Sequence, residues 1–349
     1  MSAKILLTDL PYEQLASWVA EQGEPSFRAQ QLFAWIYHSL VFDFADMTNL
    51  PLGLRQKWSD LAIIQPLQPL ETLTSADGLT TKVLLELPDG DTIESVLMHY
   101  EGRHTVCVST QVGCALGCPF CATGQSGFKR NLSGGEIVGQ VLYFARQLQE
   151  QGTAITNVVF MGMGEPLANY EATWQAIRIL NDHRGFNLGA RRFTISTVGL
   201  VPGIRRMAQE GLSVGLAVSL HAANNALRDR LVPINKRYPL AELLAACQEY
   251  VQRTGRRISF EYALIQGVND DPGQARELAH LLRGLLCHVN LIPLNPTAEC
   301  DYQPSTRERI MAFRRELNRM GIASTVRLGR GIDIQAGCGQ LRSRQRKAA

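Results

Sequence analysis

From about residue 104 onward, segments rich in β-forming residues alternate with segments whose apolar residues have helical spacing. Alternation of this kind predicts a parallel sheet covered by helices, either open or curled toward a barrel. The first of these helices opens with a capping box, Ser133 followed by Glu136 three residues later. The predicted strands are 104–110, 155–161, 192–197, 213–220, 257–264, 286–293 and 322–327, and the predicted helices are 133–150, 169–183, 201–210, 239–254, 272–283 and 305–320.

The residues before this region follow a different pattern. Residues 11–21 and 27–40 have helical spacing. Two β-rich stretches, 79–87 and 92–99, flank Pro-Asp-Gly-Asp and predict a hairpin. We therefore expect an N-terminal helical domain over 1–75, a β-hairpin linker over 76–100, an α/β core over 101–340 and a basic tail over 341–349.

Three cysteines, Cys114, Cys118 and Cys121, follow the first predicted strand of the core in a C-x3-C-x2-C spacing. Thiolates suit Fe–S clusters, and a four-iron cluster with three protein ligands leaves one iron open to a small molecule. A structural zinc site is the alternative, but it usually needs a fourth Cys or His. The nearest histidines, His104 and His183, are distant in the sequence. A disulfide framework is disfavoured because the eight cysteines show no secretory pattern.

Further polar motifs follow the ends of other predicted strands. The carboxyl ends of parallel strands meet on one face, where barrel enzymes place their active sites. Taken singly, each Ser or Asn could equally be a turn or cap residue, and the histidine a buried polar side chain. The motifs are Met-Gly-Met-Gly-Glu-Pro at 161–166, Ser196-Thr197, Ser219-Leu220-His221 and Asn295.

The composition, 45% hydrophobic and 19% charged, predicts a globular chain with a sizeable core. It shows no apolar run long enough for a membrane span and no secretory signal, so we expect a cytoplasmic protein. The net charge of +3 conceals an asymmetry: residues 1–100 carry 5 basic and 13 acidic side chains, and residues 301–349 carry 11 and 4. Basic pairs suit a phosphate backbone, although a solvated surface is the alternative. These pairs are Lys129-Arg130, Arg191-Arg192, Arg205-Arg206, Lys236-Arg237 and Arg256-Arg257.

The cysteine loop, with Phe120 before its last cysteine, resembles the signature of the radical S-adenosylmethionine (SAM) superfamily. Four further stretches, at 106–114, 127–132, 163–167 and 337–341, resemble the RlmN family of RNA adenine C2-methyltransferases. The resemblance covers nearly the whole chain. It implies a partial (β/α)6 TIM-like barrel and a 4Fe-4S cluster on Cys114, Cys118 and Cys121, with SAM at the open iron.

The resemblance also implies which residues bind SAM. Gly164, Glu165 and Pro166 would hold its amino group, since a carboxylate such as Glu165 accepts hydrogen bonds from an ammonium. The other residues that the resemblance implies at the SAM site are Phe120, Ser196, Ser219, Leu220, His221 and Asn295.

Adenine C2 is not a nucleophile, and the resemblance implies a route around this difficulty. Cys338 takes a methyl group from one SAM, and a radical from a second SAM removes a hydrogen from that group. The resulting methylene radical adds to C2, a base removes the C2 proton, and Cys107 attacks the Cys338 sulfur to release the product with a transient disulfide. Glu94 matches the family's proposed base, although its residue type alone indicates an exposed strand carboxylate. We expect Cys247, Cys287 and Cys300 to be small buried hydrophobes.

An adenine in folded RNA must be extruded to reach such a site. The resemblance implies two substrates, an adenosine in the peptidyl-transferase region of 23S rRNA and the adenosine 3′ of the anticodon in tRNA. We also expect a flavodoxin-like electron donor, a monomer and no membrane partner.

Three alternatives remain open. One is C8 methylation of the rRNA adenosine by the same mechanism, as in Cfr-like relatives. Another is a non-catalytic Fe–S protein that binds RNA or senses redox state. The third, activation of another protein through a glycyl radical, leaves Cys107 and Cys338 without a role.

Overall fold

A computed structural model describes residues 4–297, 300–327 and 329–343. Seven strands of its core run parallel to their neighbours, and they confirm the seven strands predicted from the sequence. These strands are β6 (Arg103–Cys107), β9 (Asn157–Phe160), β10 (Phe193–Thr197), β11 (Gly215–Ser219), β12 (Ile258–Leu264), β13 (Cys287–Pro293) and β14 (Ser324–Val326).

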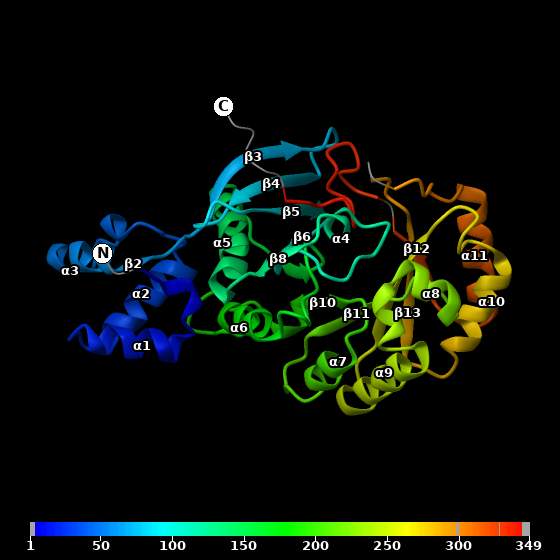
Figure 1. The fold of residues 1–349 in the computed structure, drawn as a ribbon. Coiled ribbons are helices and arrows are strands. Elements are labelled where there is room, and N and C mark those ends of the chain that lie inside the picture. The colour runs from blue at the N-terminus through cyan, green and yellow to red at the C-terminus, as the bar shows by residue number, and fades with distance from the viewer. Residues whose placement is uncertain (1–3, 298–299, 328, 344–349) are drawn as a thin grey trace.

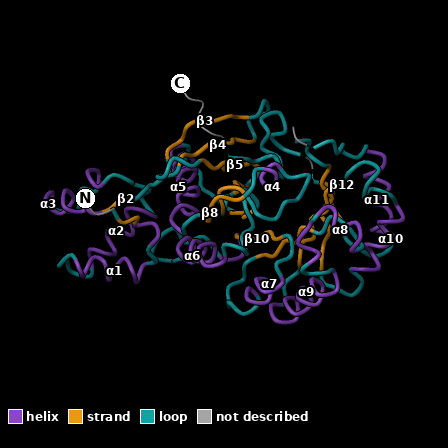
Figure 2. The backbone as a smooth tube through the Cα atoms, viewed as in Figure 1, coloured by secondary structure: helices purple, strands orange, loops and turns teal. Residues whose placement is uncertain are grey.

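A helix follows each of the first six parallel strands, and the predicted capping box of Ser133 and Glu136 opens the first. The helices lie outside the curved row of strands (Figure 2). This arrangement confirms the predicted partial barrel. The predicted helices correspond to α5 (Gly134–Glu150), α6 (Tyr170–Asn181), α7 (Val201–Met207), α9 (Leu240–Thr254), α10 (Pro272–Leu281) and α11 (Arg307–Arg319).

The described core also contains two helices that were not predicted, the four-residue α4 (Ala122–Gln125) and α8 (Asn225–Leu231). Helix α8 has only seven residues, too few for a clear apolar period, and the Asn224 side chain caps it by accepting a hydrogen bond from the Leu227 N–H. This helix carries Arg228, which is fully buried and donates hydrogen bonds to the carbonyls of Val198 and Leu220 at 2.6 and 3.1 Å. The helix therefore fixes two turns that follow parallel strands.

Three antiparallel strands, β3 (Gln68–Thr74), β4 (Thr80–Glu86) and β5 (Thr92–Tyr100), extend the same sheet beyond β6. The whole sheet has the order β14-β13-β12-β11-β10-β9-β6-β5-β4-β3. The predicted hairpin is confirmed as β4 and β5, whereas β3 falls within the range that we expected to be helical. Its register shifts between Pro69 and Glu71, and nearly all of its residues are exposed, so it lacks the apolar alternation of a buried strand.

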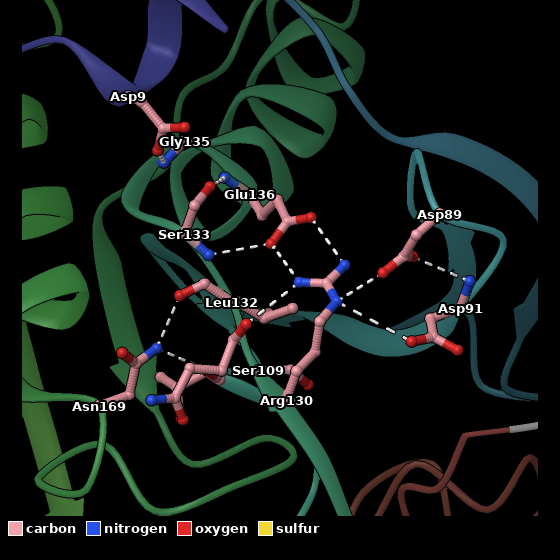
Figure 3. A network of polar contacts seen from close by, with 12 residues as sticks. Asp9, Asp89, Asp91, Ser109, Arg130, Leu132, Ser133, Gly135, Glu136 and Asn169 are labelled. Carbon is pink, nitrogen blue, oxygen red and sulfur yellow. Dashed lines mark hydrogen bonds and ion pairs between the residues drawn. The ribbon is translucent and has the colours of Figure 1, made fainter. Parts of the chain in front are cut away.

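The N-terminal part contains the helices α1 (Tyr12–Glu21), α2 (Phe27–Tyr37) and α3 (Leu52–Leu61), and it lies beside the barrel at the blue end of the chain (Figure 1). Strands β1 (Ile5–Leu6) and β2 (Ala62–Ile63) pair in parallel and close it. Its core includes Trp18, Phe33 and Trp58. Asp9 joins it to the barrel by accepting a hydrogen bond from the Gly135 N–H at the start of α5 (Figure 3). No helix in the described part of the chain is long and apolar enough to cross a membrane.

Candidate active site

The cysteine loop is closed at its base by a short ladder that was not predicted. Strands β7 (Gln111–Gly113) and β8 (Phe128–Asn131) pair antiparallel, and the Cys114 N–H donates to the Gly127 carbonyl at 2.7 Å. Gly113 has a φ of +75°, and a Cβ at this position would collide with the Gly127 carbonyl oxygen. Only glycine therefore allows the two ends of the loop to meet so closely.

Within this loop, Cys118 is buried and Cys114 and Cys121 are half-buried. Burial raises the pKa of Cys114 to about 11, and the neighbouring Cys121 adds to the increase. Across the described residues, no three His, Cys, Asp or Glu side chains are arranged as they stand to hold a metal ion. The three thiols thus lie on one loop, but their sulfur atoms do not all converge on one point. As three soft donors on one loop, they match the chemistry of an Fe–S cluster better than that of Mg²⁺ or Ca²⁺.

A pocket opens beside this loop at the carboxyl ends of the parallel strands, and we call it the inner pocket. Its empty volume, which includes the open space at its mouth, is about 990 Å³. Three residues predicted to hold the cluster or SAM, Cys114, Pro166 and Leu220, are not among the described residues that line it. The predicted residues that do line it are Cys118, Phe120, Cys121, Gly164, Glu165, Ser196, Ser219, His221, Asn295 and Cys338.

Glu165 joins two of the strand-end loops around the inner pocket. Its carboxylate accepts hydrogen bonds from the N–H groups of Leu167 and Val198, at 3.0 and 2.9 Å. Burial nevertheless raises its pKa to about 7. The Thr197 side chain also donates to this carboxylate, which leaves one of its four acceptor positions for a ligand cation. The preceding Gly164 has a φ of +99° and packs against Gln111 so closely that a Cβ would lie 2.6 Å from its side chain.

His221 is a neutral hydrogen-bonding group in the inner pocket wall. Its Nδ1 accepts from the Ala263 N–H at 3.0 Å, which places the ring proton on Nε2. Burial and, to a smaller extent, the charge of Arg228 lower its pKa to about 3. Its ring meets Phe120 edge-on, with 5.0 Å between centroids. The ring is therefore held in place with one N–H available.

Two residues of this pocket were missed from the sequence, Glu261 on β12 and Arg327 just after β14. Glu261 Oε1 accepts from Asn290 Nδ2 at 2.8 Å and lies 3.5 Å from Arg327, while its buried Oε2 has no hydrogen-bond partner. An unpartnered buried acceptor in a pocket wall fits a ligand that donates hydrogen bonds, as SAM does. A charged residue inside a buried strand was the signal that could have identified Glu261.

A second cavity, the outer pocket, adjoins the first and has an empty volume of about 1500 Å³. Cys107 lines the outer pocket, and Cys338 lines both pockets. Burial raises the pKa of Cys107, and the neighbouring Cys338 raises it further. All eight cysteines are free thiols. The two cysteines predicted outside the cluster are thus neighbours, and Cys338 stands where the two pockets meet.

The Cys338 segment is fastened to the cysteine loop and to the barrel. The Ala122 N–H donates to the Gly339 carbonyl at 2.8 Å, and the Thr123 hydroxyl donates to the Leu341 carbonyl at 2.6 Å. Asn295 Nδ2 donates to the Cys338 carbonyl at 3.1 Å. The position of Cys338 is therefore set by the loop that carries the three clustered cysteines.

Glu94 is 1% exposed, which overturns its interpretation as an exposed strand carboxylate. It pairs with Lys82 at 3.1 Å and accepts from the Arg342 N–H at 3.0 Å. Cys107 lies directly opposite Val96 in the sheet, so Glu94, two residues from Val96, is on the same face as Cys107. It does not itself line either pocket among the described residues.

Two of the basic pairs expected to suit a phosphate backbone are engaged with carboxylates instead. Lys129 pairs with Asp91, and Arg130 forms ion pairs with Asp89 at 2.6 Å and Glu136 at 2.8 Å, which joins β8 to the β4–β5 turn and to α5 (Figure 3). The pair Arg205-Arg206 is also engaged, since Arg205 contacts Glu249 and Arg206 contacts Glu171. Most of the predicted basic tail, residues 344–349, lies outside the described residues.

Comparisons with known proteins agree with this architecture. Residues 5–64 match the model of the ribosomal RNA large subunit methyltransferase N-terminal domain, and residues 108–279 match that of the radical SAM superfamily. The crystal structure of a radical SAM methyltransferase from Sphaerobacter thermophilus superposes with a TM-score of 0.96 at 54% identity, covering 97% of this chain and 99% of the other.

Curated relatives are similar over nearly the full length. A probable dual-specificity RNA methyltransferase RlmN of Chloroflexus aurantiacus is 50% identical, covering 95% of this chain and 90% of its own. The protein of the same name in Geobacillus kaustophilus is 47% identical, covering 97% and 92%. The chain therefore belongs to the RlmN family of the radical SAM superfamily.

Proposed function

We propose that this chain methylates C2 of adenosine in RNA, with 23S rRNA and tRNA as its two substrates. The relatives are named dual-specificity RNA methyltransferases, which supports two RNA classes. The observation that carries the proposal is the position of Cys338, which lines one pocket together with two clustered cysteines and another together with Cys107. One sulfur can thus face a methyl donor on one side and an acceptor base on the other.

The inner pocket is the proposed SAM site, and Cys114, Cys118 and Cys121 are the proposed ligands of a 4Fe-4S cluster. When bound, the cluster and SAM supply a methyl group and one-electron chemistry for hydrogen abstraction. Glu165 is placed to accept from an ammonium group, and the free Oε2 of Glu261 is placed to accept from a further donor. Ser196, Ser219, His221 and Asn295 supply the remaining polar contacts.

Cys338 is the proposed carbon carrier and Cys107 the proposed resolving thiol. Cys338 is an exposed residue, and the guanidinium of Arg327 opposes the rise in its pKa that desolvation of the sulfur in the pocket causes. This charge favours the thiolate that accepts a methyl group. In the closing step the Cys107 thiolate attacks the Cys338 sulfur, so an S–S bond forms as the S–C bond breaks, and the electron pair passes to the carbon on the base, which takes up a proton to become the methyl group. A thiol reductant then restores both cysteines.

The remaining assignments are also proposals. Glu94 is the proton acceptor, the region over residues 1–75 is an RNA-contacting domain, residues 76–100 are a linker, and residues 101–340 form the catalytic core. A flavodoxin-like protein supplies electrons to a monomer. A reducing, cytoplasmic compartment suits eight free thiols.

The test is methylation by anaerobically reconstituted protein of an rRNA fragment and a tRNA, followed by mass analysis of the nucleosides. We expect 2-methyladenosine from both RNAs, and none from a Cys338→Ala variant that retains its iron. 8-Methyladenosine as the product would favour the Cfr-like alternative. Zinc in place of iron, or RNA binding without SAM cleavage, would contradict the proposal.

A further inference from the structure

Tyr100 at the end of β5 lies between two arginines in the wall of the outer pocket. The Arg103 guanidinium carbon lies 4.1 Å from the Tyr100 ring centroid, and that of Arg330 lies 4.2 Å from it. Arg103 is the cross-strand partner of Tyr100 in the β5–β6 hairpin. Arg330 comes from the C-terminal segment and also donates to the His99 carbonyl at 2.8 Å. Two distant parts of the chain thus place positive charge on one ring.

Neither of these charges is in direct contact with a carboxylate. In the part of the chain that the structure describes, neither Arg103 nor Arg330 forms an ion pair, and the nearest carboxylate that interacts with Arg330, Asp77, does not line the outer pocket. Glu101, in the turn beside Arg103, makes no ion pair with either one. Arg130, Arg205 and Arg206 behave differently, since each is paired with a carboxylate. The outer pocket is therefore a locally positive cavity.

The two guanidinium groups lie within about 8 Å of one another, because each contacts the same ring. At that separation, which is comparable to the Debye length in physiological salt, the two charges still repel each other. Cation–π contacts with Tyr100 hold them in place. An anion bound beside the ring would relieve the repulsion, and planar guanidinium groups match the oxygens of a phosphate.

We propose that Arg103 and Arg330, oriented by Tyr100, bind a phosphodiester of the RNA next to the extruded adenosine. This inference rests on the proposed function, because it assigns the contact that directs the base toward Cys107 and Cys338. An RNA phosphate is the anion that suits this place. The three residues line only the outer pocket, whereas the SAM carboxylate belongs to the inner pocket. Tyr100 is a positioning residue in this arrangement.

The test compares Arg103→Met, Arg330→Met and the double variant with Arg319→Met, an exposed arginine on α11 that pairs with Glu316. Reconstituted holoprotein without reductant is titrated with tRNA at several NaCl concentrations. We expect each single variant to weaken binding about tenfold and to reduce the slope of log K against log salt by about 0.7–0.9. The Arg319→Met protein should bind like the unaltered protein.

A second measurement separates an RNA contact from a structural role. Methylation of Cys338 by SAM alone, followed by mass spectrometry of the intact protein, should remain unchanged in the arginine variants. Tyr100→Phe should keep the affinity for RNA, and Tyr100→Leu should lower it. An unchanged salt slope in the double variant, or an equal loss of Cys338 methylation, would overturn the proposal. Failure of the unaltered protein to methylate RNA would instead count against the proposed function.

Discussion

Lys82 and Glu94 form an ion pair in the interior, with 3.1 Å between Nζ and Oε1 and side chains only 3% and 2% exposed. The pair contacts both ends of the Cys338 segment. Lys82 Nζ donates to the Gln335 carbonyl at 3.1 Å, and Glu94 Oε2 accepts from the Arg342 N–H at 3.0 Å. A polar pair on neighbouring strands therefore holds the segment that carries the proposed methyl carrier.

Replacing Lys82 with Met should lower the free energy of unfolding by about 3–5 kcal/mol, because it leaves a buried carboxylate without its cation. Urea unfolding of the protein measures this loss. The double variant Lys82→Met/Glu94→Leu buries no charge and should recover most of the stability. Amide exchange at Arg342 should nevertheless increase in both proteins. A single variant as stable as the unaltered protein would show that the pair contributes little.

Glu94→Gln tests the proposed proton acceptor, and Lys82→Met is its control, because it breaks the same ion pair but keeps the carboxylate. Glutamine has nearly the same shape and keeps an oxygen that can accept from the Arg342 N–H, but it cannot take up a proton at neutral pH. We expect the variant to stop after the carbon–carbon bond has formed, so that RNA remains attached to Cys338. Denaturing gel electrophoresis would reveal this adduct. Normal turnover would remove Glu94 from the mechanism.

Cys107→Ala should still methylate Cys338 but fail to release product, because no thiol remains to attack the sulfur–carbon link. Intact-protein mass spectrometry after one turnover should show protein joined to RNA. Cys247→Ala is the matched control, since Cys247 is a buried free thiol on α9 outside both pockets. Release of methylated RNA by the Cys107 variant would contradict the assigned role.

Gly113→Ala should prevent the cysteine loop from closing, because its Cβ would collide with the Gly127 carbonyl. Gly117 is a matched position in the same loop. It also has a positive φ, of +64°, but a Cβ there would meet nothing within 4 Å. Gly117→Ala should therefore cost only about 1–2 kcal/mol of backbone strain. Iron content after anaerobic reconstitution should fall sharply in the first variant and little in the second.

His99 and His104 make stability sensitive to acid. Their Nδ1 atoms lie 2.9 Å apart, and burial, followed by repulsion from His104, lowers the pKa of His99 below its usual 6.5. The stability that comes from keeping His99 neutral is complete above about pH 6.5, the pKa in the unfolded chain, and is lost as the pH falls from there through the lower pKa of the folded protein. In His104→Asn the pKa of His99 should rise part of the way, because burial remains. NMR titration measures this shift. Urea unfolding at two pH values should show that the free energy of unfolding falls less on acidification in the variant than in the unaltered protein.

The barrel was predictable because its signals are local and strong. Each parallel strand is a short apolar run followed by a helical period, and the capping box of Ser133 and Glu136 marks one boundary directly. The strand-end motifs converged as expected, because strands of one direction share an edge. The cysteine loop was recognisable from its spacing, whereas the roles of the other site residues came from the family resemblance.

What escaped prediction depends on contacts between distant segments. Strand β3 is an exposed edge with little apolar alternation, and its pairing with β4 decides its structure. Glu94 looks like a surface carboxylate in the sequence because Lys82 and residue 342 reach it only in the fold. Arg327 and Arg330 carry no motif of their own, and their positions follow from where the C-terminal segment turns back over the hairpin (Figure 1).

The irregular end of β3 has a consequence for how this protein behaves at high concentration. The edge strand of an open sheet has unpaired backbone N–H and C=O groups, which can form hydrogen bonds with the edge strand of another molecule. Here Pro69 removes one donor, the irregularity beside it twists the ribbon, and Glu71 adds a charge. The sheet can therefore stay uncapped on that side without recruiting a second molecule.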